Sequence, residues 1–151
     1  MSDSPTPGDG TGDQAEGQDW SSGRPVHFEI HAADPTAATE FYTSVFGWTT
    51  EDWSDFAGMP YFGVRTGDRG PGIDGAIMQR QSEDPEVGGA VAGAVLTLGV
   101  ADFDATAQRI LAAGGTVALE KHALPGMAWQ GYFHDPSNNV FGVHQPDPEA
   151  R

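Results

Sequence analysis

Residues 28–47, FEIHAADPTAATEFYTSVFG, and residues 96–115, LTLGVADFDATAQRILAAGG, decide the fold of this 151-residue chain. The second stretch repeats the first at a constant offset of 68 positions. The offset matches Ala33 with Ala101, Asp34 with Asp102, Ala37 with Ala105 and Gly47 with Gly115. A repeat at a fixed offset indicates two copies of one structural unit, so the same supersecondary motif is predicted twice.

Each copy reads as a β-strand followed by a capped α-helix. Asp34 and Asp102 stand where an N-cap side chain accepts the unpaired N–H groups of the first helical turn. A proline follows the first of them, at the helical position where its missing N–H costs nothing. Apolar residues then recur at helical spacing, and Gly47 in one copy and Gly114 or Gly115 in the other predict left-handed helix ends.

Short strand-like stretches separated by turn residues follow each helix. They lie at 49–52, 61–66 and 73–80 in the first copy and at 116–122, 128–135 and 140–145 in the second. Each copy is therefore predicted to be a βαβββ module. The modules are predicted at 25–80 and 94–146, joined by a polar, Gly-rich linker at 81–93 and followed by a short tail at 147–151.

Residues 1–24 are rich in Gly, Ser, Asp and Pro, and Trp20 is their only aromatic residue. Such a segment buries too little apolar surface to offset the entropy lost on ordering. It is expected to be a disordered acidic tail.

The composition limits the partners and the compartment. With 22 acidic and 7 basic residues the net charge is -15, which repels phosphate backbones and anionic lipids. The chain has no cysteine, no secretory leader pattern and no apolar run near the roughly 18 residues that span a bilayer. We expect a cytoplasmic protein that binds a small molecule and has neither a nucleic acid nor a membrane as partner.

Three motifs set in two βαβββ modules carry a family resemblance: DPTAATEFYTSVFGW, GVADFDATAQRILAAGGTV and PGMAWQGYFHDPSNNVFGVHQP. They resemble the vicinal oxygen chelate superfamily, which includes glyoxalase I, extradiol dioxygenases and bleomycin resistance proteins. The resemblance implies an α+β fold, in which two tandem βαβββ modules form a curled mixed β-sheet around a cavity with the helices outside. It also implies a homodimer. The fold hosts many unrelated activities, so it does not by itself give the function.

Metal-dependent members of that superfamily carry ligands on the first and last strands of each module. By this resemblance His27 occupies a ligand position with a suitable imidazole, whereas its counterpart in the second module is Val95. The last strands supply Gly142 in place of the usual carboxylate, and Ala76, or Gln79 in an alternative alignment. A non-haem iron site needs two histidines and a carboxylate, and zinc or nickel needs about four ligands. No cofactor is therefore expected, and a divalent Zn, Ni, Mn or Fe ion at His27 is the alternative.

The stretch VHFEIH, residues 26–31, places His27, Glu29 and His31 on one face of the first strand, because successive strand side chains alternate. The apolar residues between them are expected to face the helices, which leaves the polar set facing the cavity. Neighbours on this face start roughly 6.6 Å apart and could share a metal with an outside partner, of which His144 is the best candidate. Glu29, desolvated beside an imidazole, could instead act as a metal-free general base, with His27 as the second catalytic candidate.

The predicted lining of the cavity is His27, Glu29, His31, Gln79, Trp129 and His144. Trp129 is the expected aromatic wall, because it lies where the PGMA loop enters a strand. The other aromatic residues near the strands, Tyr61 and Tyr132 among them, are individually expected in the core or an interface. His122 and His134 are expected to be solvated.

The predicted function is the binding of a small organic molecule in the cavity, without the usual metal triad. One alternative is a metal-dependent lyase, isomerase or dioxygenase that uses His27 with nonstandard ligands. A second alternative is sequestration of a cationic antibiotic, which the acidic surface favours. Nucleophilic catalysis is not indicated, since the sequence has neither a cysteine nor a G-x-S-x-G motif.

Overall fold

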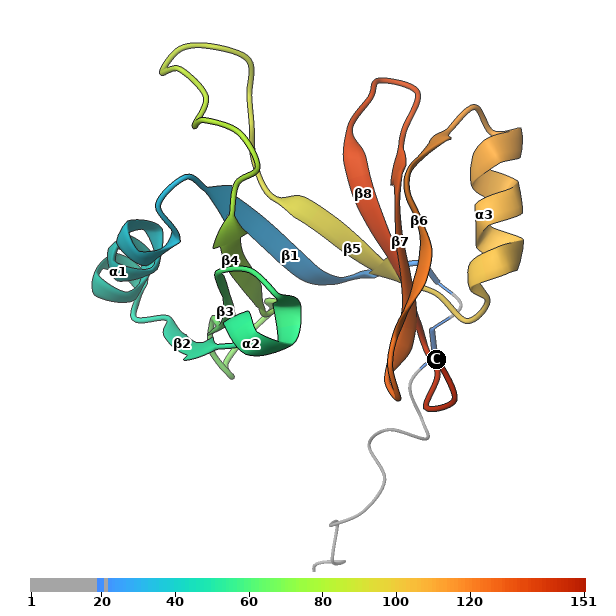
Figure 1. Ribbon diagram of the computed structural model, residues 1–151, viewed down its shortest axis with the longest axis horizontal. Coiled ribbons are helices and arrows are strands. Elements are labelled where there is room, and N and C mark those ends of the chain that lie inside the picture. Colours follow the sequence, from blue (N-terminus) through green and yellow to red (C-terminus); the bar gives the residue numbers. More distant parts are fainter. Residues whose placement is uncertain (1–18, 21) are drawn as a thin grey trace, which may run out of the picture.

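The computed structural model describes residues 19–20 and 22–151 (Figure 1). The first module contains β1 (Pro25–Ala32), α1 (Pro35–Phe46), β2 (Thr49–Asp52), the one-turn helix α2 (Ser54–Ala57), β3 (Tyr61–Arg65) and β4 (Gly75–Gln79). The second contains β5 (Val95–Gly99), α3 (Phe103–Ala112), β6 (Thr116–Leu124), β7 (Ala128–His134) and β8 (Val140–Pro146). The repeat thus forms the two predicted modules, and α2 is an addition that the sequence pattern did not predict.

The strands form one mixed sheet in the order β2-β3-β4-β1-β5-β8-β7-β6. The modules meet where β1 and β5 pair antiparallel, and the pairs β1–β4 and β5–β8 are parallel. β2 and β6 form the two ends of the order, so the sheet does not close into a barrel. Figure 1 shows β1 and β5 as a bridge between the modules, with α1 and α3 on the outer sides. The prediction of a curled α+β sheet with outer helices is confirmed.

Both long helices begin and end as their sequences predict. The side chains of Asp34 and Asp102 each accept a hydrogen bond from the backbone N–H three residues later, at 3.0 Å in both helices. Gly47 ends α1 in the left-handed region with a φ of 73°, which a residue without a Cβ adopts at little cost. After α3 the left-handed residue is Gly114, with a φ of 97°, and not Gly115.

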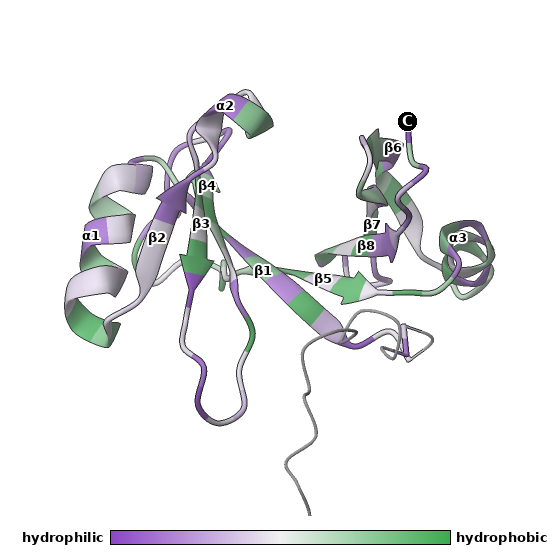
Figure 2. Ribbon diagram, turned by 90° about the horizontal axis from the view of Figure 1, so that it is seen from below, coloured by the Kyte–Doolittle hydropathy of each residue, from purple (hydrophilic) through white to green (hydrophobic). Residues whose placement is uncertain are grey.

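Each helix covers a separate apolar cluster on the outer face of the sheet. The cluster under α1 is built on Phe28, Val64 and Ile77, and the cluster under α3 on Val100, Phe103, Phe133 and Val143. Apolar and polar segments alternate along β1 in Figure 2. Because strand side chains alternate, burial of Phe28 and Ile77 under α1 turns Glu29 and Ala76 to the opposite face, here called the inner face.

In the described part of the chain, no helix has the length and apolar character needed to cross a bilayer.

Candidate functional site

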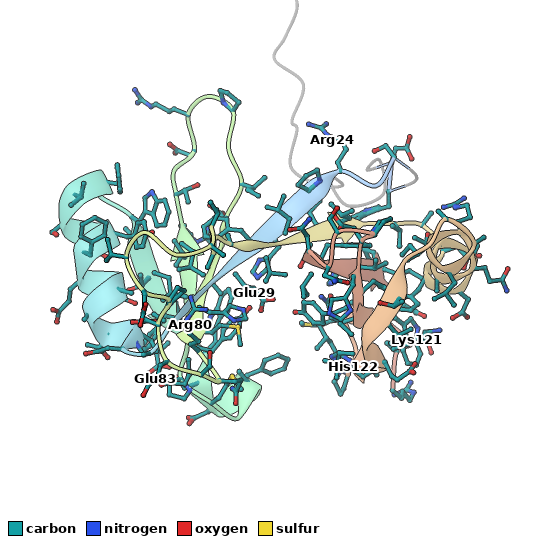
Figure 3. All side chains as sticks on the ribbon, turned by 90° about the horizontal axis from the view of Figure 1, so that it is seen from above. Arg24, Glu29, Arg80, Glu83, Lys121 and His122 are labelled. Carbon is teal, nitrogen blue, oxygen red and sulfur yellow. The ribbon has the colours of Figure 1, made fainter. Side chains whose placement is uncertain are left out.

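Glu29 lies at the centre of the inner face, on the strand that joins the modules. It pairs with Ala76 of β4 on one side and with Val95 of β5 on the other. Figure 3 shows its side chain in the space between the modules, yet only 6% of the residue is exposed. A carboxylate buried to this extent needs hydrogen-bond donors, because an unpaired charge is costly to remove from water.

Two tyrosines, one from each module, supply those donors. The hydroxyl of Tyr132 on β7 donates to Oε1 of Glu29 at 2.6 Å, and the hydroxyl of Tyr61 on β3 donates to Oε2 at 3.2 Å. Burial first, and then the charge of Glu29, raises the pKa of both tyrosines well above the ordinary value of 10.0. Both phenols therefore stay protonated, and each uses its single O–H donor in the hydrogen bond to the carboxylate.

His27 extends this hydrogen-bond chain beyond Tyr61. Its Nε2 lies 3.1 Å from the Tyr61 hydroxyl. Since the only phenol proton goes to Glu29, the phenol oxygen accepts here and Nε2 carries the imidazole proton. Burial lowers the pKa of His27 below 6.5, against the raising effect of the charges on Glu29 and Asp74. Neutral His27 in this tautomer leaves Nδ1 as an acceptor.

His144 ends a matching chain in the second module. Its Nδ1 lies 2.8 Å from Oε1 of Gln130, a residue only 7% exposed, and Gln130 also hydrogen-bonds the Tyr132 side chain. Burial, followed by the charge of His27, lowers the pKa of His144. With Nδ1 as the donor to Gln130, the free acceptor of neutral His144 is Nε2. Two chains of donors thus converge on Glu29, and each ends in an imidazole with an acceptor nitrogen.

The superfamily's metal-ligand positions all lie on the inner face, and three of the four cannot coordinate. Ala76 and Val95 flank Glu29, and Gly142 pairs with Thr97 of β5. Glu29 and Thr97 occupy equivalent positions of the repeat, so Ala76 is the counterpart of Gly142 and the alignment through Gln79 is wrong. His27 alone keeps a ligating side chain.

The space around Gly142 is already filled by neighbouring side chains. A Cβ atom there would lie 2.7 Å from Thr97 Oγ1, 3.1 Å from Gln130 Nε2 and 3.2 Å from a ring carbon of Tyr132. Across residues 19–20 and 22–151, no group of three His, Asp or Glu side chains is placed to hold a metal ion. The residues present do not fit the metal that the superfamily implies.

The structure places the other predicted lining residues on different faces. His31 follows Glu29 on the inner face, where it pairs with Met78 and is partly buried. Gln79 pairs with Ala32, on the face of Ile77, and its amide donates to the Ala33 carbonyl at 2.9 Å. The prediction that Gln79 lines the cavity is wrong, because the strand alternation turns this side chain outward to hold the end of β1.

Trp129 is also on the outer face, since it alternates with Gln130 along β7. Its ring packs against the cluster under α3, and its Nε1 donates to Asp147 at 2.9 Å. The Nζ atom of Lys121 lies 4.6 Å from the ring centre. The prediction of Trp129 as the pocket aromatic is therefore wrong, and Tyr132 is the inner-face aromatic of this strand.

Tyr61 and Tyr132 were not predicted as partners of Glu29, nor Gln130 as the residue between Tyr132 and His144. Tyr132 and Glu29 are 103 residues apart in sequence, and their contact depends on strand order and register across both modules. The available signal was the alternation along β7, which separates Gln130 and Tyr132 from Trp129.

Trp20 adds an aromatic contact at the second-module end of the inner face. A Cβ atom on Gly99 would lie 2.5 Å from the indole, so only glycine allows this approach. The Trp20 and His144 ring centres are 6.2 Å apart, and Gly99 N donates to the Arg24 carbonyl at 3.0 Å. Trp20 and Arg24 belong to the segment expected to be a disordered tail, and residues 1–18 and 21 of that segment lie outside the described residues.

A cavity of about 450 Å³ opens on the inner face of the first module. Its lining residues are His27, Thr49, Thr50, Glu51, Trp53, Gly63, Val64, Arg65, Asp74 and Gly75. The cavity reaches the hydrogen-bond chain at His27, and its volume lies within the range of sites that bind small organic molecules.

Comparisons with known proteins place the chain in a family. The family model of the Glyoxalase/Bleomycin resistance protein/Dioxygenase superfamily matches residues 24–143. The anthracycline biosynthesis protein DauV of Streptomyces sp. (strain C5) is 28% identical over 133 residues, which cover 82% of this chain and 47% of DauV. CFP32 of Mycobacterium bovis (strain ATCC BAA-935 / AF2122/97), named as a glyoxylase, is 30% identical over 121 residues, or 80% of this chain and 43% of CFP32. The chain thus spans about half the length of these curated relatives.

Solved structures share the fold at low sequence identity. Methylmalonyl-CoA epimerase from Mycobacterium tuberculosis has a TM-score of 0.56 at 21% identity, covering 82% of this chain and 88% of the epimerase. A superfamily member from Vibrio splendidus 12B01 has a TM-score of 0.57 at 19% identity, covering 81% and 97% of the two chains. The family match extends over both modules and includes the strand of His27 and Glu29. The chain therefore belongs to the Glyoxalase/Bleomycin resistance protein/Dioxygenase superfamily.

Proposed function

We propose that the protein binds a small organic molecule on its inner face, through hydrogen-bond donors of that molecule and without the metal triad of its superfamily. The supporting observation is the buried carboxylate of Glu29, which accepts a hydrogen bond from the hydroxyl of both Tyr61 and Tyr132. The polar atoms left to a ligand are then acceptors: the phenol oxygens, Nδ1 of His27 and Nε2 of His144. A molecule with N–H or O–H groups complements such a surface.

The cavity next to His27 gives this surface a place for the ligand. Its volume of about 450 Å³ suits a small organic molecule, and its walls come from all four strands of the first module. The network supplies orientation through His27, the member of the network that lines the cavity, because a donor group of the ligand can point at its Nδ1.

Metal-free acid-base catalysis on the bound molecule is a second candidate. Glu29 already accepts hydrogen bonds from both phenols, so Nδ1 of His27 is the base of this network that reaches the cavity. Burial keeps His27 neutral, and the charges of Glu29 and Asp74 favour the imidazolium once a proton has been taken up. The metal-dependent alternative rests on His27 only. The other three ligand positions hold Ala76, Val95 and Gly142, which cannot coordinate a metal.

The proposal is tested with indole and 1-methylindole, which differ only in an N–H donor. Titration of tag-free protein by calorimetry should give an affinity for indole about fivefold or more above that for 1-methylindole. In Glu29→Gln the preference should fall below about twofold, because an amide is a weaker acceptor and its NH₂ group opposes one phenol. Glu83→Gln, an exposed acid of the linker, is the matched control and should keep the preference.

The same titrations are repeated after chelation. Equal binding of the two indoles by the native protein would contradict the proposal. Binding that disappears with EDTA and returns with Zn, Ni, Mn or Fe would favour the metal-dependent alternative.

A further inference from the structure

Trp53 forms a fixed aromatic wall in the first-module cavity. It precedes α2, and three atoms of its six-membered ring lie 2.5–2.6 Å from the position that a Cβ of Gly63 would take. These nearly equal distances place the ring face-down on the sheet, which only a glycine at this position allows. Tyr61 stacks beside it at 6.3 Å between ring centres and 19° between ring planes. Trp53 is 41% exposed, so the side of the ring away from Gly63 is open to a ligand.

Acidic side chains outnumber basic ones around this wall. Glu51 of β2 and Asp74 ahead of β4 line the cavity together with a single cation, Arg65. Asp74 is held in place, since its Oδ1 accepts from the Thr66 backbone N–H at 2.8 Å and from the Thr66 hydroxyl at 3.3 Å. Among the described residues, the ion pairs within 4.0 Å involve other side chains, so neither cavity acid is neutralised by a contacting cation.

We infer that this cavity takes a planar organic cation, stacked on Trp53 with its charged nitrogen toward Glu51 and Asp74. The inference rests on the proposed function and adds the class of ligand. A cation above an indole face is attracted by the ring, and two uncompensated carboxylates add to that attraction in a partly enclosed site. The N–H groups of the same nitrogen suit the acceptor Nδ1 of His27, which lines the cavity as well. A carboxylate ligand meets repulsion from both acids, with Arg65 as the one cation in the lining to oppose it.

The experiment uses three probes that share one naphthalene ring. At pH 7, 1-naphthylmethylamine is a cation, 1-naphthylmethanol is neutral and 1-naphthoate is an anion. The amine should bind about fivefold or more tighter than the alcohol, and the naphthoate should bind most weakly. The amine should also shift the Trp53 indole N–H resonance in a ¹⁵N spectrum and leave that of Trp129, on the outer face, in place.

Variants separate the cavity from the overall charge of the protein. Glu51→Gln combined with Asp74→Asn should cut the preference for the amine to less than about twofold and leave the affinity for the alcohol unchanged. Asn at 74 keeps an oxygen for the Thr66 bonds, so the turn is preserved. Glu83→Gln removes one acid outside the cavity lining and should leave the order of the probes unchanged.

Two results would overturn the inference. One is an alcohol that binds as tightly as the amine. The other is a preference for the amine that survives the double variant, since the net charge of -15 would then be its source. If the indole pair is distinguished through Glu29 while the naphthalene series shows no order by charge, the ligand class is wrong and the proposed function stands. If no probe of either series binds, both are wrong.

Discussion

Gly142→Ala is expected to destabilise the protein by about 1–2 kcal/mol. The added methyl would lie 2.7 Å from Thr97 Oγ1, whereas ordinary contacts begin at 3.4 Å. Neither Gln130 nor Tyr132 can move away freely. Tyr132 donates the 2.6 Å bond to Glu29, and Oε1 of Gln130 lies 2.8 Å from Nδ1 of His144. Overpacking of this kind costs about 1–3 kcal/mol. Alanine also lowers the conformational entropy of the unfolded chain, which offsets about 0.4–1 kcal/mol of that cost. For a chain of this length the melting temperature should fall by about 2–8 °C.

Gly93→Ala is the matched control, since it makes the same chemical change where no atom lies within 4 Å and φ is not left-handed. Urea unfolding of both variants, followed by far-UV circular dichroism with a shared m-value, measures the difference. Adding Thr97→Ala to Gly142→Ala removes the closest contact and should recover part of the loss. If Gly142→Ala and Gly93→Ala unfold at the same midpoint, the packing described around Gly142 is incorrect.

Two further predictions concern the imidazoles. Burial lowers the pKa of His27 and His144 in the folded state, so the unfolded chain binds protons more readily. The free energy of unfolding should therefore be steady above about pH 6.5 and fall as the pH drops below it. Urea unfolding at a series of pH values tests this, and a slope unaffected by His144→Asn would contradict the role of His144. Trp20→Ala uncovers His144 and should raise the pKa of its imidazole toward 6.5, whereas Trp20→Phe should leave that pKa unchanged. NMR titration measures both variants, and an unchanged pKa in Trp20→Ala would show that Trp20 does not shield the imidazole.

The modules could be predicted from the sequence because their signals are local. Asp34 and Asp102 cap the helices within three residues, and each strand follows a turn that the composition marks. The inner face of β1 could be predicted for the same reason, since the alternation of His27 and Glu29 with buried Phe28 needs no knowledge of neighbouring strands.

The hydrogen-bond partners of Glu29 could not be predicted in this way. They depend on which strands meet and in which register, and Tyr132 reaches Glu29 only because β1 and β5 join the two modules. Trp129 and Gln79 were assigned to the wrong face because the alternation of β7 and β4 has no fixed starting point without the buried clusters. The position of Trp20 had no local signal, since its neighbour Gly99 belongs to β5, a strand far along the chain.

The pairing of β1 with β5 also has a mechanical consequence. This ladder connects the two halves of the sheet, and Glu29 lies within it while its two phenol donors lie on opposite halves. A rotation of one half about the ladder lengthens at least one of the two bonds to Glu29. Since one carboxylate accepts a hydrogen bond from each half, these two bonds oppose such a rotation and hold the halves at one angle.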